Sequence, residues 1–145
     1  MNDGGREFKL RDQNRELWLD FIDEPVDSER RLQRGTPIHQ DYFITKNGKT
    51  VHVILLDVRY EYESKSLGDR LGEDQWQWLD LALKRGKERK LDLTMIGGGV
   101  QIIPERGMPA MLEDFKSVNR LRLFKILKEN KMESVVFISG DVHSG

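Results

Sequence analysis

The stretch YFITKNGKTVHVILLD, residues 42–57, decides the fold of this 145-residue chain. Two arms rich in β-branched and aromatic side chains flank Asn47 and Gly48, a pair that suits the positive φ angles of a type I′ turn. We therefore expect a β-hairpin here. The second arm continues as the apolar run 53–56, which is typical of a strand covered on both faces and predicts that it lies inside a sheet.

Two further apolar runs, at residues 91–96 and 134–139, predict buried strands. Between the hairpin and the first of these runs, residues 73–83 have acidic side chains in the first turn and Trp76 and Leu79 on one face, which predicts a helix. The order strand, helix, strand indicates a βαβ unit and an α/β fold.

Two more helices are expected outside this unit. One covers residues 12–23, and the other runs from about residue 117 to residue 130. The apolar stripe of the first consists of Leu17, Trp18, Phe21 and Ile22, and the inward residues of the second are Val118, Leu121, Phe124 and Leu127. Residues 27–34, which include Arg30 and Arg31, are predicted to form a charged linker in solvent.

Composition excludes several classes of protein. The chain has 24 Lys and Arg against 25 Asp and Glu, so no net field attracts nucleic acid or an anionic membrane. It has no Cys, which excludes disulfides and thiolate sites. Its apolar runs are far shorter than the ~20 residues of a membrane-spanning helix. Nothing marks a domain boundary, so residues 1–145 are taken as one domain.

The sharpest chemical signal follows the last predicted strand. Asp141 and His143 are two residues apart, so in an extended chain they point the same way and present a carboxylate beside an imidazole. These are ligands for hard or borderline metals. Alternatively, Asp141 caps a turn and His143 is a surface imidazole.

Asp57 and Arg59 end the hairpin strand in the same spacing. They either form an ion pair that ties the strand to its loop, or Arg59 contacts a phosphate, because a guanidinium matches phosphate geometry. After the glycines at 97–99, Gln101 either faces the same site as a neutral donor or satisfies the loop backbone.

Taken in order, several segments of the chain resemble the alkaline phosphatase D family, the PhoD-like metallophosphatases. The similar segments are MNDGG at 1–5, WLDF at 18–21, SERR at 28–31, VILLDVRY at 53–60, LGEDQWQWL at 71–79, VQIIP at 100–104 and ISGDVH at 138–143. The resemblance runs nearly end to end.

This resemblance implies a four-layer αββα metallophosphoesterase sandwich that hydrolyses phosphomonoesters or phosphodiesters. Asp141 and His143 match the Gly-Asp-x-His metal motif of the family, and Asn2 matches a metal-binding asparagine, with its neighbour Asp3 a weaker candidate. Arg59 and Gln101 are the expected substrate contacts. No catalytic residue is assigned.

The resemblance also implies a cofactor of two metal ions, which would polarise the phosphoryl oxygens and activate water. The oxygen and imidazole ligands do not choose among iron, calcium, manganese and zinc. The expected partner is a phosphate ester substrate, with no nucleic-acid surface and no membrane span. Members of this family are often exported, but the sequence does not indicate where this chain is located.

The resemblance begins just after the Asp-His-Asp/Glu segment of the family and ends at the histidine motif. We therefore expect the chain to be part of a longer parent enzyme and to be inactive or nearly so alone. The alternative is a noncatalytic α/β module of the same ancestry that binds phosphate compounds or a protein partner.

Overall fold

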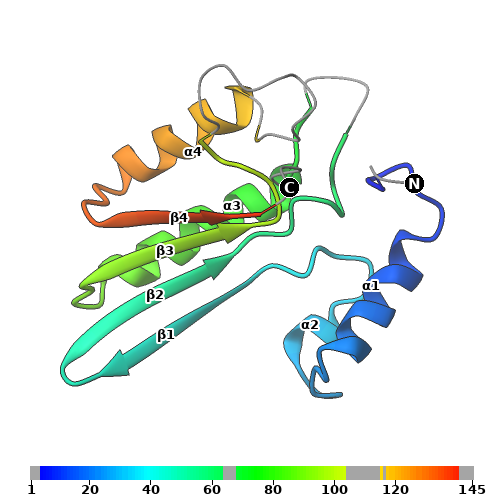
Figure 1. Cartoon of the computed structure of the whole chain (residues 1–145), viewed down its shortest axis with the longest axis horizontal. Helices are drawn as coiled ribbons and strands as arrows, with labels where there is room; N and C mark the ends of the chain where they lie inside the picture. Colours follow the sequence, from blue (N-terminus) through cyan, green and yellow to red (C-terminus); the bar gives the residue numbers. More distant parts are fainter. Residues whose placement is uncertain (1–3, 64–67, 104–114, 116, 141–145) are drawn as a thin grey trace, which may run out of the picture.

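The computed structural model describes residues 4–63, 68–103, 115 and 117–140. Its centre is a mixed four-stranded sheet of order β1-β2-β3-β4 (Figure 1). The strands are β1 (Gln40–Lys46), β2 (Lys49–Leu55), β3 (Leu93–Gly98) and β4 (Val135–Ser139). β1 is antiparallel to β2, whereas β2, β3 and β4 are parallel to one another. The expected α/β class is therefore confirmed.

The hairpin between β1 and β2 is confirmed. Asn47 and Gly48 have φ angles of 51° and 73°, the left-handed values that a type I′ turn requires at both central positions. The register pairs Lys46 with Lys49 and places Tyr42 opposite Val53.

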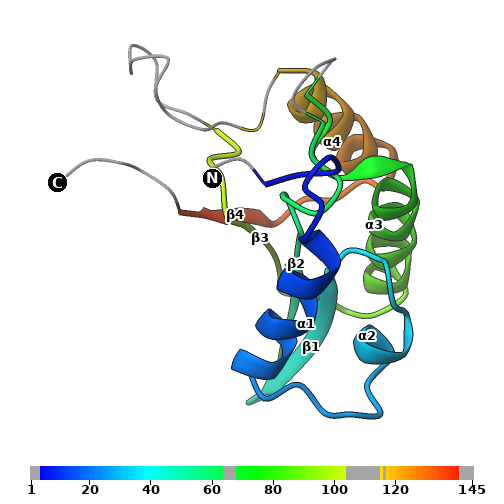
Figure 2. The same cartoon turned by 90° about the vertical axis from the view of Figure 1, so that its right-hand side faces the viewer.

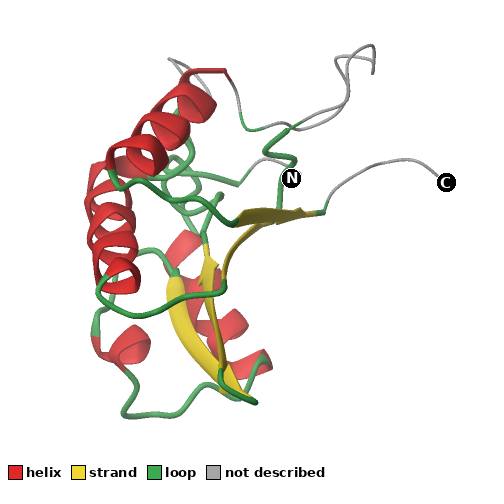
Figure 3. Ribbon diagram, turned by 90° about the vertical axis from the view of Figure 1, so that its left-hand side faces the viewer, coloured by secondary structure: helices red, strands yellow, loops and turns green. Residues whose placement is uncertain are grey.

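Two helices connect the parallel strands and lie on one face of the sheet. These are α3 (Gly72–Lys87), between β2 and β3, and α4 (Ser117–Glu129), before β4. Figures 2 and 3 show both on the same side. The core between helices and sheet is apolar, and its fully buried members include Ile54, Ile96, Trp76, Leu79, Leu83 and Leu123. The predicted βαβ unit is confirmed.

The prediction that the strands are covered on both faces is wrong. One face of β2 points at the helices and is buried, but Leu55 on the other face is 43% exposed. β4 is an edge strand whose Val136 and Ile138 are 45% and 50% exposed. Apolar runs show that a strand lacks polar side chains, but they do not show what lies on each side of it.

The inward face predicted for α4 is confirmed for Leu127 and wrong for the other three residues. Val118, Leu121 and Phe124 are exposed, while Leu123 is buried beside Leu127 in the core. This helix carries apolar residues around more than half of its circumference, so periodicity alone does not choose the buried side. Packing against α3 and the sheet makes that choice.

Two helices lie outside the sheet layer: α1 (Arg11–Phe21) and α2 (Glu29–Leu32). In Figure 1, α1 lies beyond the carboxyl ends of β2, β3 and β4. Its predicted apolar stripe points outward, with Leu17 64% and Phe21 86% exposed. The residues that α1 buries instead are Arg15 and Leu19. The hydrogen bonds of Arg15, described below, explain this reversal.

No helix in the described ranges is long and apolar enough to cross a membrane.

Candidate functional site

The carboxyl ends of the three parallel strands meet at one edge of the sheet. Leu55 at the end of β2 is paired with Gly97, and Gly97 is paired with Ile138 of β4. The loops that follow these strands therefore begin side by side. This is the edge at which open α/β sheets bind their ligands.

Asp57 organises the first of these loops. Its Oδ1 atom accepts hydrogen bonds from the backbone N–H groups of Arg59 and Tyr60, both at 2.9 Å, and its Oδ2 atom accepts one from the N–H of Ile38 at 3.0 Å. The Asp57 carboxylate therefore ties the end of the strand to its loop through three backbone N–H groups.

Gln75 of α3 holds the same loop through a contact that no local sequence pattern indicates. Its side chain is fully buried. It accepts a hydrogen bond from the backbone N–H of Asp57 at 2.9 Å and donates one to the Asp57 carbonyl at 2.8 Å. A buried amide that satisfies both backbone groups of one residue fixes that residue relative to the helix.

A cavity of about 550 Å³ opens at this edge, between α1 and the ends of β2 and β3. Arg59, one of the two predicted substrate contacts, lines it and is half-buried. The remaining lining is partly apolar and partly basic: Gly4, Phe8, Arg11, Asn14, Arg15, Trp18, Arg30, Ile38, Leu55, Leu56, Asp57, Val58, Tyr60 and Gly99. Its volume is in the range of ligand pockets.

The start of the described chain reaches this cavity through a close backbone contact. The N–H of Arg6 donates to the carbonyl of Tyr62 at 2.9 Å. A Cβ atom on Gly5 would lie 2.3 Å from the same carbonyl oxygen, so only glycine fits there. Gly4, the residue before Gly5, lines the cavity.

The end of the described chain reaches the same edge. Gly140 follows β4, and a Cβ atom built on it would lie 4.0 Å from the carbonyl oxygen of Gly99. Gly99 and Gly4 both line the cavity. The two ends of the described chain therefore approach one place, although they are more than 130 residues apart in sequence.

The predicted metal ligands Asn2, Asp141 and His143, and the weaker candidate Asp3, lie outside the described residues. The described neighbours of these residues are Gly4 and Gly140. Within the ranges that the structure describes, no group of three or more His, Asp or Glu residues could hold a metal ion.

Gln101, the second predicted substrate contact, is not among the residues that line the cavity. Its backbone carbonyl accepts a hydrogen bond from the N–H of Phe115 at 2.7 Å. Its Oε1 atom is buried and has no hydrogen-bond partner in the described structure. This hydrogen bond belongs to the backbone of Gln101 and not to its side chain, so both roles considered for the side chain stay predictions.

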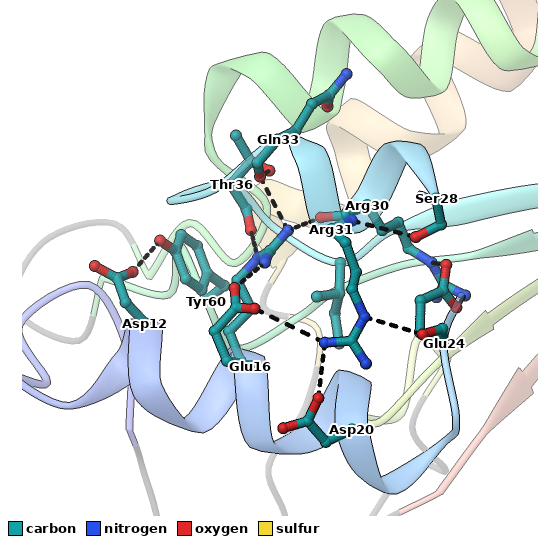
Figure 4. Close-up of polar contacts among 12 residues, drawn as sticks. Asp12, Glu16, Asp20, Glu24, Ser28, Arg30, Arg31, Gln33, Thr36 and Tyr60 are labelled. Carbon is teal, nitrogen blue, oxygen red and sulfur yellow. Dashed lines mark hydrogen bonds and ion pairs between the residues drawn. The ribbon is translucent and has the colours of Figure 1, made fainter. Parts of the chain in front are cut away.

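Arg15 of α1 lines the cavity. Figure 4 shows the polar contacts of this region, with Glu16 of α1 and with Gln33 and Thr36 of the loop after α2. The side chain of Arg15 is only 1% exposed. The guanidinium donates to the carbonyl oxygens of Thr36 at 2.6 Å, Gln33 at 2.9 Å, and Arg30, and it also bonds Glu16. Three backbone acceptors satisfy the buried cation and anchor the loop after α2 to α1.

Residues 27–34 are not the solvated linker that the sequence predicts. Ser28 caps α2 by accepting a hydrogen bond from the N–H of Arg31. The side chains of Arg30 and Arg31 are only 12% and 17% exposed. Arg30 pairs with Glu24, and Arg31 pairs with Asp20 at 2.7 Å. A run of charged residues is predicted to be solvated because residue spacing does not show which distant residues will pair with it.

Tyr60 contributes a neutral group to the cavity wall. Burial and a hydrogen bond to Asp12 raise the pKa of Tyr60 to about 12. The phenol therefore stays protonated at neutral pH and cannot act there as a base.

Comparison with known proteins identifies no relative. No protein-family model matches the chain, and neither does any curated protein or solved structure.

Proposed function

We propose that this chain carries part of the active site of a metal-dependent phosphoesterase, which hydrolyses phosphomonoesters or phosphodiesters as the alkaline phosphatase D family does. The observation that carries the proposal is that both ends of the described chain reach this edge: Gly4 lines the cavity together with Arg59 and Gly99, and Gly140 lies beside Gly99. The proposed ligands Asn2, Asp141 and His143 are close neighbours of these glycines in sequence.

The chemistry of the proposed donors fits a metal. An amide oxygen, a carboxylate and an imidazole together suit a hard or borderline divalent cation. Three donors are fewer than a two-metal centre needs, and the described residues offer no further cluster. We therefore propose that these residues supply only part of the ligand set and that the chain alone has little or no activity.

The described residues have roles around that centre. Arg59 would bind the phosphate, since its guanidinium can donate two parallel hydrogen bonds to phosphoryl oxygens. Asp57 would keep Arg59 in place, because it bonds the N–H of Arg59 directly. Bound metal ions would stabilise charge on the phosphoryl group and activate water for attack.

The face of the sheet opposite α3 and α4, called the open face, supports our proposal of a four-layer architecture. On this face most cross-strand neighbours are apolar or glycine, although Gln40 lies opposite Leu55 and Lys46 opposite Lys49, and its exposed apolar members are Tyr42, Ile44, Leu55, Val136 and Ile138. Exposed apolar patches of this kind usually mark an interaction site. We propose that a second sheet of the parent enzyme packs here and completes the αββα sandwich.

The test is hydrolysis of bis-4-nitrophenyl phosphate by the parent protein that contains this sequence, with manganese and with a chelator. We expect metal-dependent turnover that falls at least a hundredfold in His143→Ala, while Ser144→Ala, the control in the same segment, changes it less than threefold. Turnover that survives both the chelator and His143→Ala would contradict the proposal.

Metal content distinguishes the alternative, a noncatalytic module that binds phosphate compounds or a protein. If the parent protein binds no metal under these conditions and hydrolyses nothing, the module interpretation replaces the enzyme.

A further inference from the structure

The cavity between α1 and the sheet has walls of two chemical kinds. One wall is apolar, and its members include Phe8, Trp18, Ile38, Leu55 and Val58. The other contains arginines. Among the described residues of the lining, Asp57 is the only acidic one, and both of its carboxylate oxygens already accept backbone N–H groups. The cavity therefore combines apolar surface with positive charge.

The four arginines of the lining differ in how tightly they are held. Arg15 and Arg30 are engaged by backbone carbonyls and by Glu24. Arg11 stacks on the Tyr60 ring, with its guanidinium carbon 4.5 Å from the ring centroid, and its polar contacts are long: 3.5 Å to the Tyr60 carbonyl and to the Glu61 carboxylate, and 3.8 Å to Asp12. These long polar contacts leave N–H donors of Arg11 able to bind an anion while the guanidinium stays on the ring.

Trp18 places an aromatic surface beside this charge. It lies on α1 one turn after Arg15, it is 41% exposed, and it lines the cavity. Leu55 at the end of β2 lines the same cavity and is 43% exposed. An apolar ligand that covers these half-exposed side chains removes their apolar surface from water, which makes binding more favourable.

We propose that this cavity binds the apolar organic part of a phosphate ester, such as an aryl group, while Arg11 and Arg59 bind its phosphate. The inference rests on the proposed function for the reaction, but the binding that it describes requires no metal. It assigns the substrate class as aryl or similarly apolar phosphate esters, in preference to small polar phosphates.

The test uses the 145-residue chain in the presence of a chelator and measures affinity by calorimetry. Phenylphosphonate and methylphosphonate carry the same anionic group and differ only in apolar size. We expect phenylphosphonate to bind at least about tenfold more tightly. Equal affinities, or no binding of either, would overturn the proposal.

Three variants locate the two halves of the site. Trp18→Ala should weaken phenylphosphonate binding about tenfold and leave methylphosphonate within twofold, whereas Arg11→Gln should weaken both. Leu81→Ala, on the exposed side of α3 and outside the cavity lining, is the matched control and should change neither. Thermal melting checks that each variant is folded, and Phe8→Ala, also in the apolar wall, replaces Trp18→Ala if that variant unfolds.

The outcomes separate this inference from the proposed function. If the aryl preference holds but the parent protein shows no metal-dependent hydrolysis, the cavity binds its ligand without being part of a phosphoesterase. If hydrolysis is found but Trp18→Ala weakens both phosphonates equally or neither, the apolar wall does not select substrate and the inference is wrong.

Discussion

Both faces of the sheet carry apolar side chains, but the surroundings of these side chains differ. Ile54 and Ile96 face the helices and are completely buried, whereas Ile138 and Val136 on the other face are about half exposed. On the covered face, α3 and α4 provide partners, and burial there stabilises the fold. The difference shows that the covered face holds this chain together, while the open face is available to another part of an assembly.

The largest expected effect is on the covered face. Leu79 of α3 is completely buried in the core, so Leu79→Ala should lower the free energy of unfolding by about 2–5 kcal/mol, since it leaves a cavity among well-packed side chains. Urea denaturation measures this. Leu81→Ala, on the same helix with its side chain 55% exposed, should cost less than about 0.5 kcal/mol. Similar losses of stability in both variants would show that the side of α3 that carries Leu79 is not the packed side of this helix.

Arg15→Met should have the next largest effect. It leaves the carbonyls of Thr36 and Arg30 without their buried donor, and each unsatisfied group costs about 1–3 kcal/mol. We expect the α1–α2 region to loosen, which limited proteolysis and amide exchange would detect. Gln13→Met, at an exposed position of the same helix, is the control. Unchanged protection of residues 30–36 in Arg15→Met would show that this guanidinium does not anchor the loop.

Stability should also fall in mild acid. Burial lowers the pKa of His39 to about 4 and lowers the pKa of His52, so between pH 6.5 and pH 4 the unfolded state binds more protons than the folded state. The free energy of unfolding should therefore drop by about 1–2 kcal/mol between pH 7 and pH 5. His39→Gln should reduce that slope. A stability that is flat over this interval would contradict the buried, neutral state of these rings.

The smallest expected effect is on the open face. Ile138→Thr should change the free energy of unfolding by less than about 0.5 kcal/mol, because the side chain has few partners to lose. It should also reduce binding of the dye anilinonaphthalene sulfonate, which reports exposed apolar surface. A loss of 2 kcal/mol or more would show that this face is already packed.

The sequence was a good guide to local structure. Asn47 and Gly48 predict the turn because left-handed backbone angles favour few residue types, and the acidic first turn of α3 predicts where that helix begins. These signals depend on neighbouring residues alone.

Burial was harder to predict because it depends on what lies opposite each side chain. Arg15 is buried because distant carbonyls accept its hydrogen bonds, and no local pattern shows them. For the same reason the outward face of α1 and the exposed face of β4 could not be predicted.

In the candidate site, too, the positions that depend on local sequence were predicted and the contacts that depend on tertiary structure were not. Spacing after a strand predicted that Asp57 and Arg59 lie at the carboxyl edge, which the structure confirms for both. The contribution of Gln75 depends on a contact between helix and loop that only the fold reveals. The metal-binding roles of Asn2, Asp141 and His143 stay predictions.

The central claim is that a cation binds at the carboxyl edge of the sheet, beside the cavity that Gly4 and Gly99 line and next to Gly140. Substoichiometric Mn²⁺ added to the ¹⁵N-labelled chain tests this directly, since a paramagnetic ion broadens the amide signals of nearby residues. We predict selective broadening of Gly4, Gly99 and Gly140 with Gly48 at the hairpin turn unaffected, and loss of this effect in His143→Ala. Uniform broadening, or none at saturating Mn²⁺, would contradict the claim.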